Sequence, residues 1–184
     1  KIRHVQSVTA KALSIDTPDP VMAEAGLKAY DLKRAGGQIP ANRLDGALYH
    51  YGSQHGDGTP GNLVASSWMS ALLDDAMVRL YATTERADVA RFVKRLGQWQ
   101  KGALVFDDQH QYDSGGPLWY PSYMIALDGT PDGLDGDVAD EHALEVATNM
   151  AWGDYFGRLL GEPDASLTPR AADVYTTYDW SVNY

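Results

Sequence analysis

The chain of 184 residues contains no cysteine. Without thiols it has no disulfide, no cysteine nucleophile and no cysteine-ligated zinc or iron–sulfur centre. The sequence also lacks any apolar run approaching the roughly 20 residues that a membrane-spanning helix needs. We therefore expect a fold held together by its hydrophobic core, with no membrane partner.

Basic residues are in the minority, because 15 lysines and arginines stand against 25 acidic residues and give a net charge of −10 at pH 7. This sign opposes binding to nucleic acid, since such affinity comes largely from releasing phosphate counterions. Hydrophobic residues make up 44% and charged residues 22%, which is ordinary for a globular protein. The length predicts a single domain over residues 1–184.

Phenylalanine is scarce, with 3 residues against 11 tyrosines and 5 tryptophans. Tyrosine and tryptophan combine an apolar face with a polar tip. Such rings suit half-buried positions on helices, and they also suit the stacking surface of a sugar-binding site. The bias is the first indication of function, and both interpretations remain open at this level.

Apolar residues that recur with helical spacing predict five helices and an all-α fold. Residues 68–82 and 85–103 carry the clearest pattern, and their short connection predicts an antiparallel helical hairpin. Gly161 is expected to end the fourth helix, and Thr168 is expected to cap the fifth. The other predicted helices span residues 20–35, 138–160 and 168 to the last residue.

Regular strands are not expected, because the only strand-like pieces are short, near residues 5–15 and 47–51. Residues 1–19 are expected to form an extended lead-in. The last helix shows no C-cap, so either it frays at the terminus or the chain is cut inside a larger structure. We favour the second interpretation and expect the remainder of a longer protein as a partner. Long polar loops, which commonly carry function on a helical scaffold, are expected at residues 41–67, 107–122 and 127–137.

The first of these loops holds a candidate site in which ionisable and aromatic side chains are concentrated. Histidine transfers protons near neutral pH, and aspartate serves as an acid, a base or an orienting partner. The catalytic candidates are therefore His55 and Asp57, and the substrate-binding candidates are Tyr49, His50 and Tyr51. A turn whose side chains bond only to the local backbone is the alternative.

The second loop combines rings and carboxylates at a density that hydrophobic packing does not require. Sugar rings present C–H faces that lie on tryptophan or tyrosine, while their hydroxyls bond to aspartate, histidine or glutamine. A carbohydrate subsite is predicted, and the alternative is that the rings pack into the core while the aspartates cap a short helix. The catalytic candidates are Asp108, His110 and Asp113, and the substrate-binding candidates are Tyr112, Trp119 and Tyr120.

The third loop is rich in carboxylates with no basic residue among them. Such crowding needs either solvent or a hard cation. Calcium at Asp132, Asp135 and Asp137 is one interpretation, and a solvated turn that caps the next helix is the favoured one. Asp74 and Asp75, in mid-helix, are predicted to lie on the solvated face. No other metal or cofactor motif is present, so none is expected.

The segment Ser66–Trp99 resembles the repeated hairpin of the (α/α) toroid of six-hairpin glycosidases, a fold that also houses several polysaccharide lyases. In this hairpin an aromatic-led helix ends in a Leu-Tyr pair, turns briefly and is followed by a partner helix. The resemblance covers about residues 60–184. It implies a partial (α/α) toroid of antiparallel hairpins, whose loops line a substrate cleft at one end.

The resemblance further implies that a hydrolase would use a carboxylic acid and a carboxylate, for which Asp107 joins the aspartates named above. A lyase would instead abstract a proton with tyrosine or histidine, and it would have to neutralise a substrate carboxylate, which these acidic loops do poorly. The leading hypothesis is a glycoside hydrolase acting on an oligo- or polysaccharide, secreted or periplasmic. A non-catalytic glycan- or protein-binding helical module is the alternative, and a polysaccharide lyase is the second alternative. All of them require the first two loops to meet at one cleft.

Overall fold

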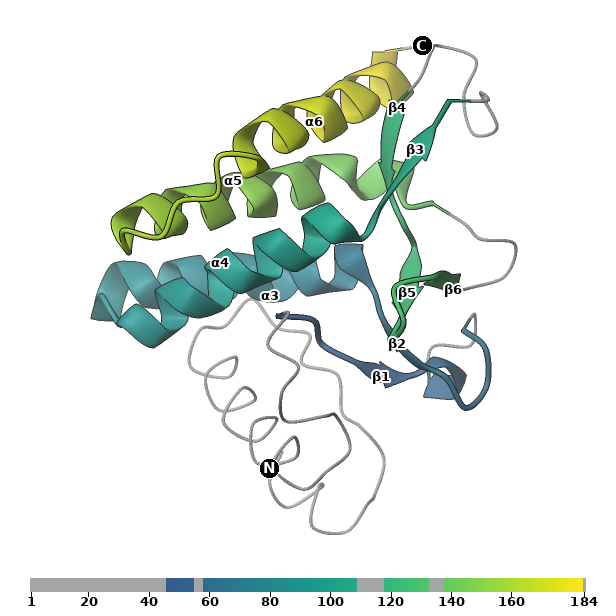
Figure 1. The fold of residues 1–184 in the computed structure, drawn as a ribbon, viewed down its shortest axis with the longest axis horizontal. Coiled ribbons are helices and arrows are strands. Elements are labelled where there is room, and N and C mark those ends of the chain that lie inside the picture. Colours follow the sequence, from purple (N-terminus) through teal and green to yellow (C-terminus); the bar gives the residue numbers. More distant parts are fainter. Residues whose placement is uncertain (1–45, 55–57, 109–117, 133–137, 184) are drawn as a thin grey trace, which may run out of the picture.

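The computed structural model describes residues 46–54, 58–108, 118–132 and 138–183 (Figure 1). The predicted helix at residues 20–35, the strand-like piece at 5–15 and the lead-in at 1–19 lie outside these ranges. The described part is mainly helical and also contains short antiparallel strands. The prediction of a purely all-α fold is therefore wrong, although its helical majority is confirmed.

Four α-helices lie within the described residues, and each overlaps a predicted range. Helix α5 begins later than predicted, because Val138 forms a β-bridge with Ser122 and a short 3-10 helix, η3, covers residues Asp140–His142. Gly161 ends this helical region in the left-handed conformation, with φ of +72°, as the sequence predicts. The helices are α3 (Ser67–Thr84), α4 (Ala87–Gly102), α5 (Ala143–Leu159) and α6 (Leu167–Asn183).

Six short strands form two antiparallel sheets in the described part of the chain. One sheet has the order β1-β2-β5-β6, and the other pairs β3 with β4. The longest of these strands has only four residues, too short for the alternation that identifies a strand in a sequence. The strands are β1 (His50–Tyr51), β2 (Leu63–Ala65), β3 (Leu104–Asp107), β4 (Leu118–Pro121), β5 (Met124–Ala126) and β6 (Pro131–Asp132).

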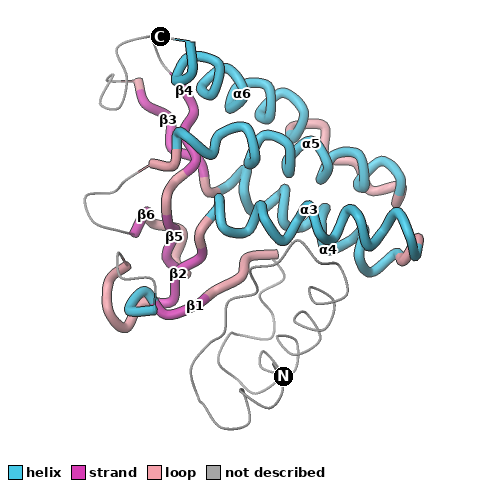
Figure 2. Tube along the Cα trace, turned by 180° about the vertical axis from the view of Figure 1, so that it is seen from behind, coloured by secondary structure: helices cyan, strands magenta, loops and turns pink. Residues whose placement is uncertain are grey.

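Helices α3 and α5 run in the same direction, and α4 and α6 run against them (Figures 1 and 2). Ring contacts set this alignment at both ends. The centroid of the Trp68 ring lies 4.5 Å from that of His142, where α3 and α5 begin, and the Tyr81 centroid lies 4.7 Å from that of Phe156 farther along. The strands gather at the end where α3 and α5 begin.

Helices α4 and α5 cross at two glycines, Gly97 and Gly153. A Cβ atom on Gly97 would lie 3.0 Å from the carbonyl oxygen of Asn149 and 3.1 Å from the Cα of Gly153. Fully buried apolar side chains, among them Leu96 and Met150, surround this contact. The two backbones can therefore approach one another only because neither glycine carries a side chain.

We expect Gly97→Ala to lower the free energy of unfolding by about 1–3 kcal/mol, because the added methyl group would meet backbone atoms that cannot turn aside. Gly102→Ala is the matched control, since no atom lies within 4 Å of its added Cβ. Alanine there should leave stability unchanged or raise it by up to about 1 kcal/mol. Urea unfolding followed by circular dichroism measures both changes. Equal stability of the two variants would contradict a tight helix crossing.

Candidate functional site

Three rings meet at the end of the bundle where α3 and α5 begin. The indole of Trp68 and the imidazole of His142 are stacked at 4.5 Å with an interplanar angle of 8°, and the Tyr123 ring lies 6.0 Å from Trp68. All three residues are partly exposed. We call this cluster of Trp68, Tyr123 and His142 the aromatic site.

Segments far apart in the sequence hold the aromatic site together. The hydroxyl of Ser67, the first residue of α3, donates a 2.6 Å hydrogen bond to the carbonyl oxygen of Ser122. The amide of Ser122 donates to the carbonyl of Ala103 after α4, and the amide of Ala139 donates to the carbonyl of Pro121. Tyr123 is therefore fixed relative to α3 and η3, which carry the other two rings.

Carboxylates flank the imidazole of the aromatic site. The Glu141 carboxylate lies 4.0 Å from Nε2 of His142, and the Glu145 carboxylate lies 3.8 Å from Nδ1. Both distances are beyond hydrogen-bond range, and both glutamates are largely exposed. The site therefore combines stacking surfaces with an imidazole that lies between two carboxylates.

The Trp68 ring can offer a ligand its exposed carbon face but not its nitrogen, because Nε1 is buried. Leu72, one turn farther along α3, is 43% exposed and extends the apolar surface beyond the ring. Sequence reasoning assigned neither Trp68 nor His142 to a site. Their only sequence signal was the aromatic start of the predicted helix and the acidic surroundings of the histidine.

Two of the predicted substrate-binding tyrosines are enclosed by the fold. Tyr49 is 3% exposed and packs with Ala65, Leu96 and Trp99 in the core, and Tyr120 is 2% exposed. Rings so enclosed present no face to a ligand, so the interpretation of aromatic residues as part of the core applies to both.

The predicted sugar platform Trp119 is partly exposed, but other side chains contact its ring. The guanidinium carbon of Arg170 lies 3.4 Å from the Trp119 ring centroid, and the Phe106 ring lies 4.8 Å away across the β3–β4 pair. A cation held over an indole face is itself a stabilising contact. Trp119 thus links β4 to α6, a role that Thr177 reinforces by donating a 2.7 Å hydrogen bond to its carbonyl oxygen.

The described parts of the first two loops do not meet at one cleft. His50 and Tyr51 are half-buried on β1, whereas Trp119 lies on β4 in the other sheet. Figures 1 and 2 place β1 and β4 at opposite ends of the strand region. Asp108 is exposed at the end of β3, and Asp107 is 4% exposed. The predicted residues that lie outside the described ranges are His55, Asp57, His110, Tyr112 and Asp113.

In the acidic third loop, the structure shows what the Asp132 carboxylate does. Asp132 is 7% exposed, and its oxygens accept hydrogen bonds from the Thr59 amide at 2.9 Å and from Asn62 Nδ2 at 2.8 Å. These bonds tie the turn before β2 to β6. Among the described residues, no three histidine, aspartate or glutamate side chains are placed to hold a metal ion. Asp135 and Asp137 lie outside those residues, so calcium there stays a prediction.

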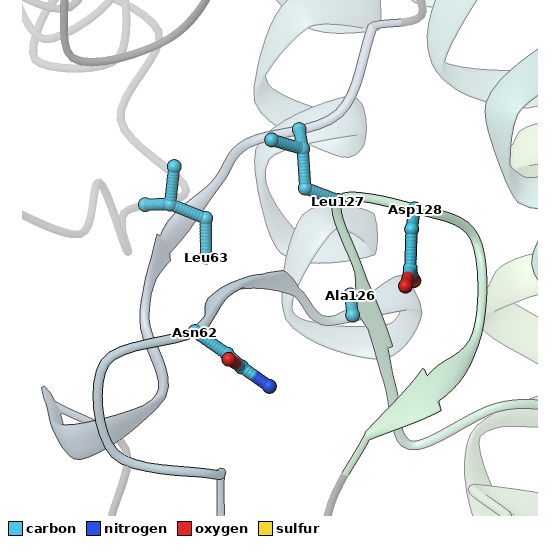
Figure 3. A pocket seen from close by; sticks show the side chains of 5 residues that line it. All are labelled: Asn62, Leu63, Ala126, Leu127 and Asp128. Atoms are coloured by element: carbon cyan, nitrogen blue, oxygen red, sulfur yellow. The ribbon is translucent and has the colours of Figure 1, made fainter.

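A shallow pocket of about 400 Å³ lies at the edge of β2 and β5 (Figure 3). Asn62, Leu63, Ala126, Leu127 and Asp128 line it. Its polar groups are already engaged, because Asn62 donates to a neighbouring carboxylate and Asp128 accepts from the hydroxyl and amide of the residue two positions on. These hydrogen bonds also lower the pKa of Asp128. The pocket therefore offers a ligand less than the aromatic site does.

Asp74 corrects another prediction. It is 0% exposed, while Asp75 is exposed and lies 2.9 Å from Arg79. The sequence places both on a solvated face, which is right for Asp75 and wrong for Asp74. The reason is that α3 packs against α4 on one side and α5 on another, so its buried face is wider than a single stripe. Burial, and secondly the charge of Asp75, raise the pKa of Asp74 well above its ordinary value.

We expect Ser67→Ala to lower the free energy of unfolding by about 1–3 kcal/mol, because the buried carbonyl of Ser122 loses its hydroxyl donor. Thr148→Ala is the control, since that exposed hydroxyl bonds only to the carbonyl one turn back on its own helix. Chemical unfolding measures the loss, and the ring-proton shifts of Tyr123 report whether its position changes. An unshifted Tyr123 in Ser67→Ala would show that this bond does not position the aromatic site.

Comparisons of the chain with protein-family models, curated proteins and solved structures find no match. Within the described residues, no helix is long and apolar enough to cross a membrane. The chemistry of the aromatic site is therefore inferred from its own side chains.

Proposed function

We propose that this chain is a carbohydrate-active protein, with a glycan lying across the aromatic site. The observation that carries the proposal is the cluster itself: Trp68 stacked on His142, with Tyr123 beside them, all partly exposed. Sugar rings pack their C–H faces on such rings. The nearby carboxylates of Glu141 and Glu145 would bond to sugar hydroxyls.

The charge of the site favours a neutral glycan or one that carries amino groups. Glu141 and Glu145 flank His142, and Asp140 lies just before them in the sequence. No lysine or arginine pairs with the aromatic site in the described structure. Acidic sugars would be repelled there, which makes a polysaccharide lyase the weakest of the three alternatives.

For catalysis we propose a hydrolase in which His142 and the glutamates beside it supply proton transfer. Glycoside hydrolysis ordinarily needs an acid and a carboxylate on either side of the bond that breaks. Glu141 and Glu145 are the carboxylates that the fold brings to the imidazole. The aspartates and histidines of the first two loops remain further catalytic candidates, since most of them lie outside the described residues.

A non-catalytic glycan-binding module is the second candidate. It is favoured by the enclosure of Tyr49 and Tyr120 and by the Arg170 guanidinium that lies over the Trp119 ring. These three residues therefore do not line the long cleft that the sequence predicts. Binding to the aromatic site needs no catalytic pair.

The partial toroid belongs to the same proposal. Two antiparallel hairpins, α3–α4 and α5–α6, stand side by side, and their first helices run in parallel, as successive hairpins of a toroid would. The aromatic site lies where these first helices begin. Secretion or export to the periplasm follows from a polysaccharide substrate and is proposed with it.

We expect Trp68→Ala to weaken glycan binding by at least about tenfold, a loss of about 1.4 kcal/mol, because it removes the central stacking face. Tyr155→Ala is the control, since Tyr155 is 52% exposed on α5 but lies outside the aromatic site. Calorimetric titration with neutral and amino-sugar oligosaccharides measures both variants. If both bound as wild type does, a glycan site at Trp68 would be ruled out.

Turnover separates the hydrolase from the binding module. We expect wild-type protein to release reducing ends from a bound oligosaccharide without absorbance near 235 nm, the signal of a lyase product. His142→Gln should lower the rate by about 10²-fold or more, the scale of general acid–base catalysis, while glycan affinity changes less. Binding without reducing ends would select the non-catalytic module, and absorbance at 235 nm would select the lyase.

A further inference from the structure

Two buried polar side chains on neighbouring helices lack hydrogen bonds that they could make. Asp74 on α3 is 0% exposed, and neither of its carboxylate oxygens has a partner among the described residues. Asn149 on α5 is 4% exposed, and its Nδ2 atom has none either. Buried polar groups are nearly always paired, so two such groups in one small bundle need an explanation.

Helical geometry places these two residues opposite one another. Tyr81 follows Asp74 by seven residues and Phe156 follows Asn149 by seven, and the Tyr81 and Phe156 rings are in contact at 4.7 Å. Residues seven apart lie on the same stripe of a helix, about 10 Å apart along its axis. Since α3 and α5 are parallel, the stripe that joins the two rings also brings Asp74 to the level of Asn149.

The aromatic site joins the same two helices nearer their first residues. Trp68 precedes Asp74 by six residues, which puts it on the flank of α3 beside the Asp74–Tyr81 stripe, and His142 immediately precedes α5. The stacked rings and the Asp74–Asn149 level are therefore successive contacts between α3 and the first part of α5. A contact that sets the distance between α3 and α5 at Asp74 and Asn149 therefore also affects that distance at the aromatic site.

We propose that Asp74 and Asn149 are positioning residues of the aromatic site. The protonated carboxyl group of Asp74 donates a hydrogen bond to the side-chain carbonyl of Asn149, and the Asn149 amide donates one back. The pair holds α3 and α5 at the separation that stacks Trp68 on His142. The consequence for glycan binding rests on the function proposed above, whereas the contact itself does not.

The surroundings of Asp74 make this contact depend on its proton. The face of α4 packed on α3 presents the apolar residues Val89, Ala90 and Val93. On α3 itself, the charged neighbour is Asp75, which has the same sign. No cation is therefore supplied from either helix to balance an ionised Asp74.

Helix α5 supplies no balancing charge at this level either. Its acidic residue Glu145 lies toward the aromatic site, beside His142. The lysines of α4 are engaged with carboxylates before α6, Lys94 with Glu162 and Lys101 with Asp164. Burial accordingly keeps the pKa of Asp74 well above 3.8. Loss of the proton removes the hydrogen-bond donor and leaves a buried charge without a partner.

The effect on stability follows from the raised pKa. An unfolded chain releases the Asp74 proton near the ordinary pKa of 3.8, while the folded chain retains it to higher pH. Unfolding is therefore favoured progressively as the pH rises from about 3.8 to the folded pKa, and this contribution is constant beyond that point. Asp74→Asn keeps the shape and the hydrogen bonds of the protonated form but cannot ionise.

The experiment compares wild type with Asp74→Asn between pH 5 and pH 9. We expect the variant to melt at least about 4 °C higher at pH 8 and to lose the part of the pH dependence that belongs to Asp74. Asp88→Asn is the matched control, because Asp88 is exposed and paired with Arg86. Asp88→Asn should leave the pH dependence of the melting temperature above pH 6 as it is in wild type. Equal slopes in wild type and Asp74→Asn would overturn the proposal.

Nuclear magnetic resonance distinguishes a positioning role from a purely structural one. The Asp74 carboxyl carbon gives the midpoint of its titration, and the ring protons of His142, shifted by the Trp68 ring, report the stack. We expect one component of the His142 shifts to follow the Asp74 midpoint in wild type and to be absent in Asp74→Asn. Asn149→Leu, which removes the partner, should reduce the ring shift at every pH. Unchanged His142 shifts in both variants would overturn the positioning role.

These measurements use no glycan, so they separate this inference from the proposed function. If Trp68→Ala leaves glycan binding intact while the His142 shifts follow Asp74, the function fails and the positioning pair stands. If Trp68→Ala abolishes glycan binding while the His142 ring-proton shifts do not follow the Asp74 titration, the positioning role is overturned and the proposed function is supported.

Discussion

The glycine crossing of α4 and α5 is the contact on which the rest of the bundle depends. With no side chain at Gly97 or Gly153, the two backbones come within van der Waals distance. This proximity lets α4 pack against α3 and α5 together, and so brings α5 alongside α3. The ring pairs that align α3 with α5 and the stacking of Trp68 on His142 follow from that placement.

The wide burial of α3 is a direct consequence. A helix packed on one neighbour buries one stripe and leaves the rest to solvent, but α3 packs on two. The added buried face includes Ser67, Ser70 and Asp74, three polar residues in successive turns. Two of them find partners in nearby carbonyl groups. Asp74 does not, and an unpaired carboxyl group inside a bundle lowers stability unless it stays protonated.

Local signals predict much of this fold, and non-local contacts account for what they miss. The hairpin of α3 and α4 was predicted because its apolar spacing and short turn are local properties. The strands escaped prediction because they are two to four residues long and gain their pairing from distant segments, such as Val64 opposite Ala126. Asp74 was misplaced for the same kind of reason, since its burial depends on a helix that begins about seventy residues later.

The candidate site shows this limit most clearly. Aromatic composition correctly drew attention to tyrosine and tryptophan, but composition does not distinguish a ring beneath Arg170 from one at the bundle end. Tyr123 directly follows the predicted loop 107–122, whereas Trp68 and His142 come from two different helices, so no sequence window contains all three. The helix stop at Gly161, by contrast, was predicted correctly, because the left-handed conformation there depends on the glycine itself and not on distant contacts.

The proposed link between the buried carboxyl group of Asp74 and the surface rings makes the ring stack depend on the protonation of Asp74. Trp68 on His142 and Tyr81 on Phe156 join α3 to α5 at two levels, and the proposed Asp74–Asn149 pair lies between them. A rigid apolar interface would hold the rings as well. An ionisable group in the middle instead makes the outer stack responsive to a proton, because helices packed at native density cannot separate at one level without moving at the next. A glycan held by those rings would then be bound most tightly while Asp74 keeps its proton.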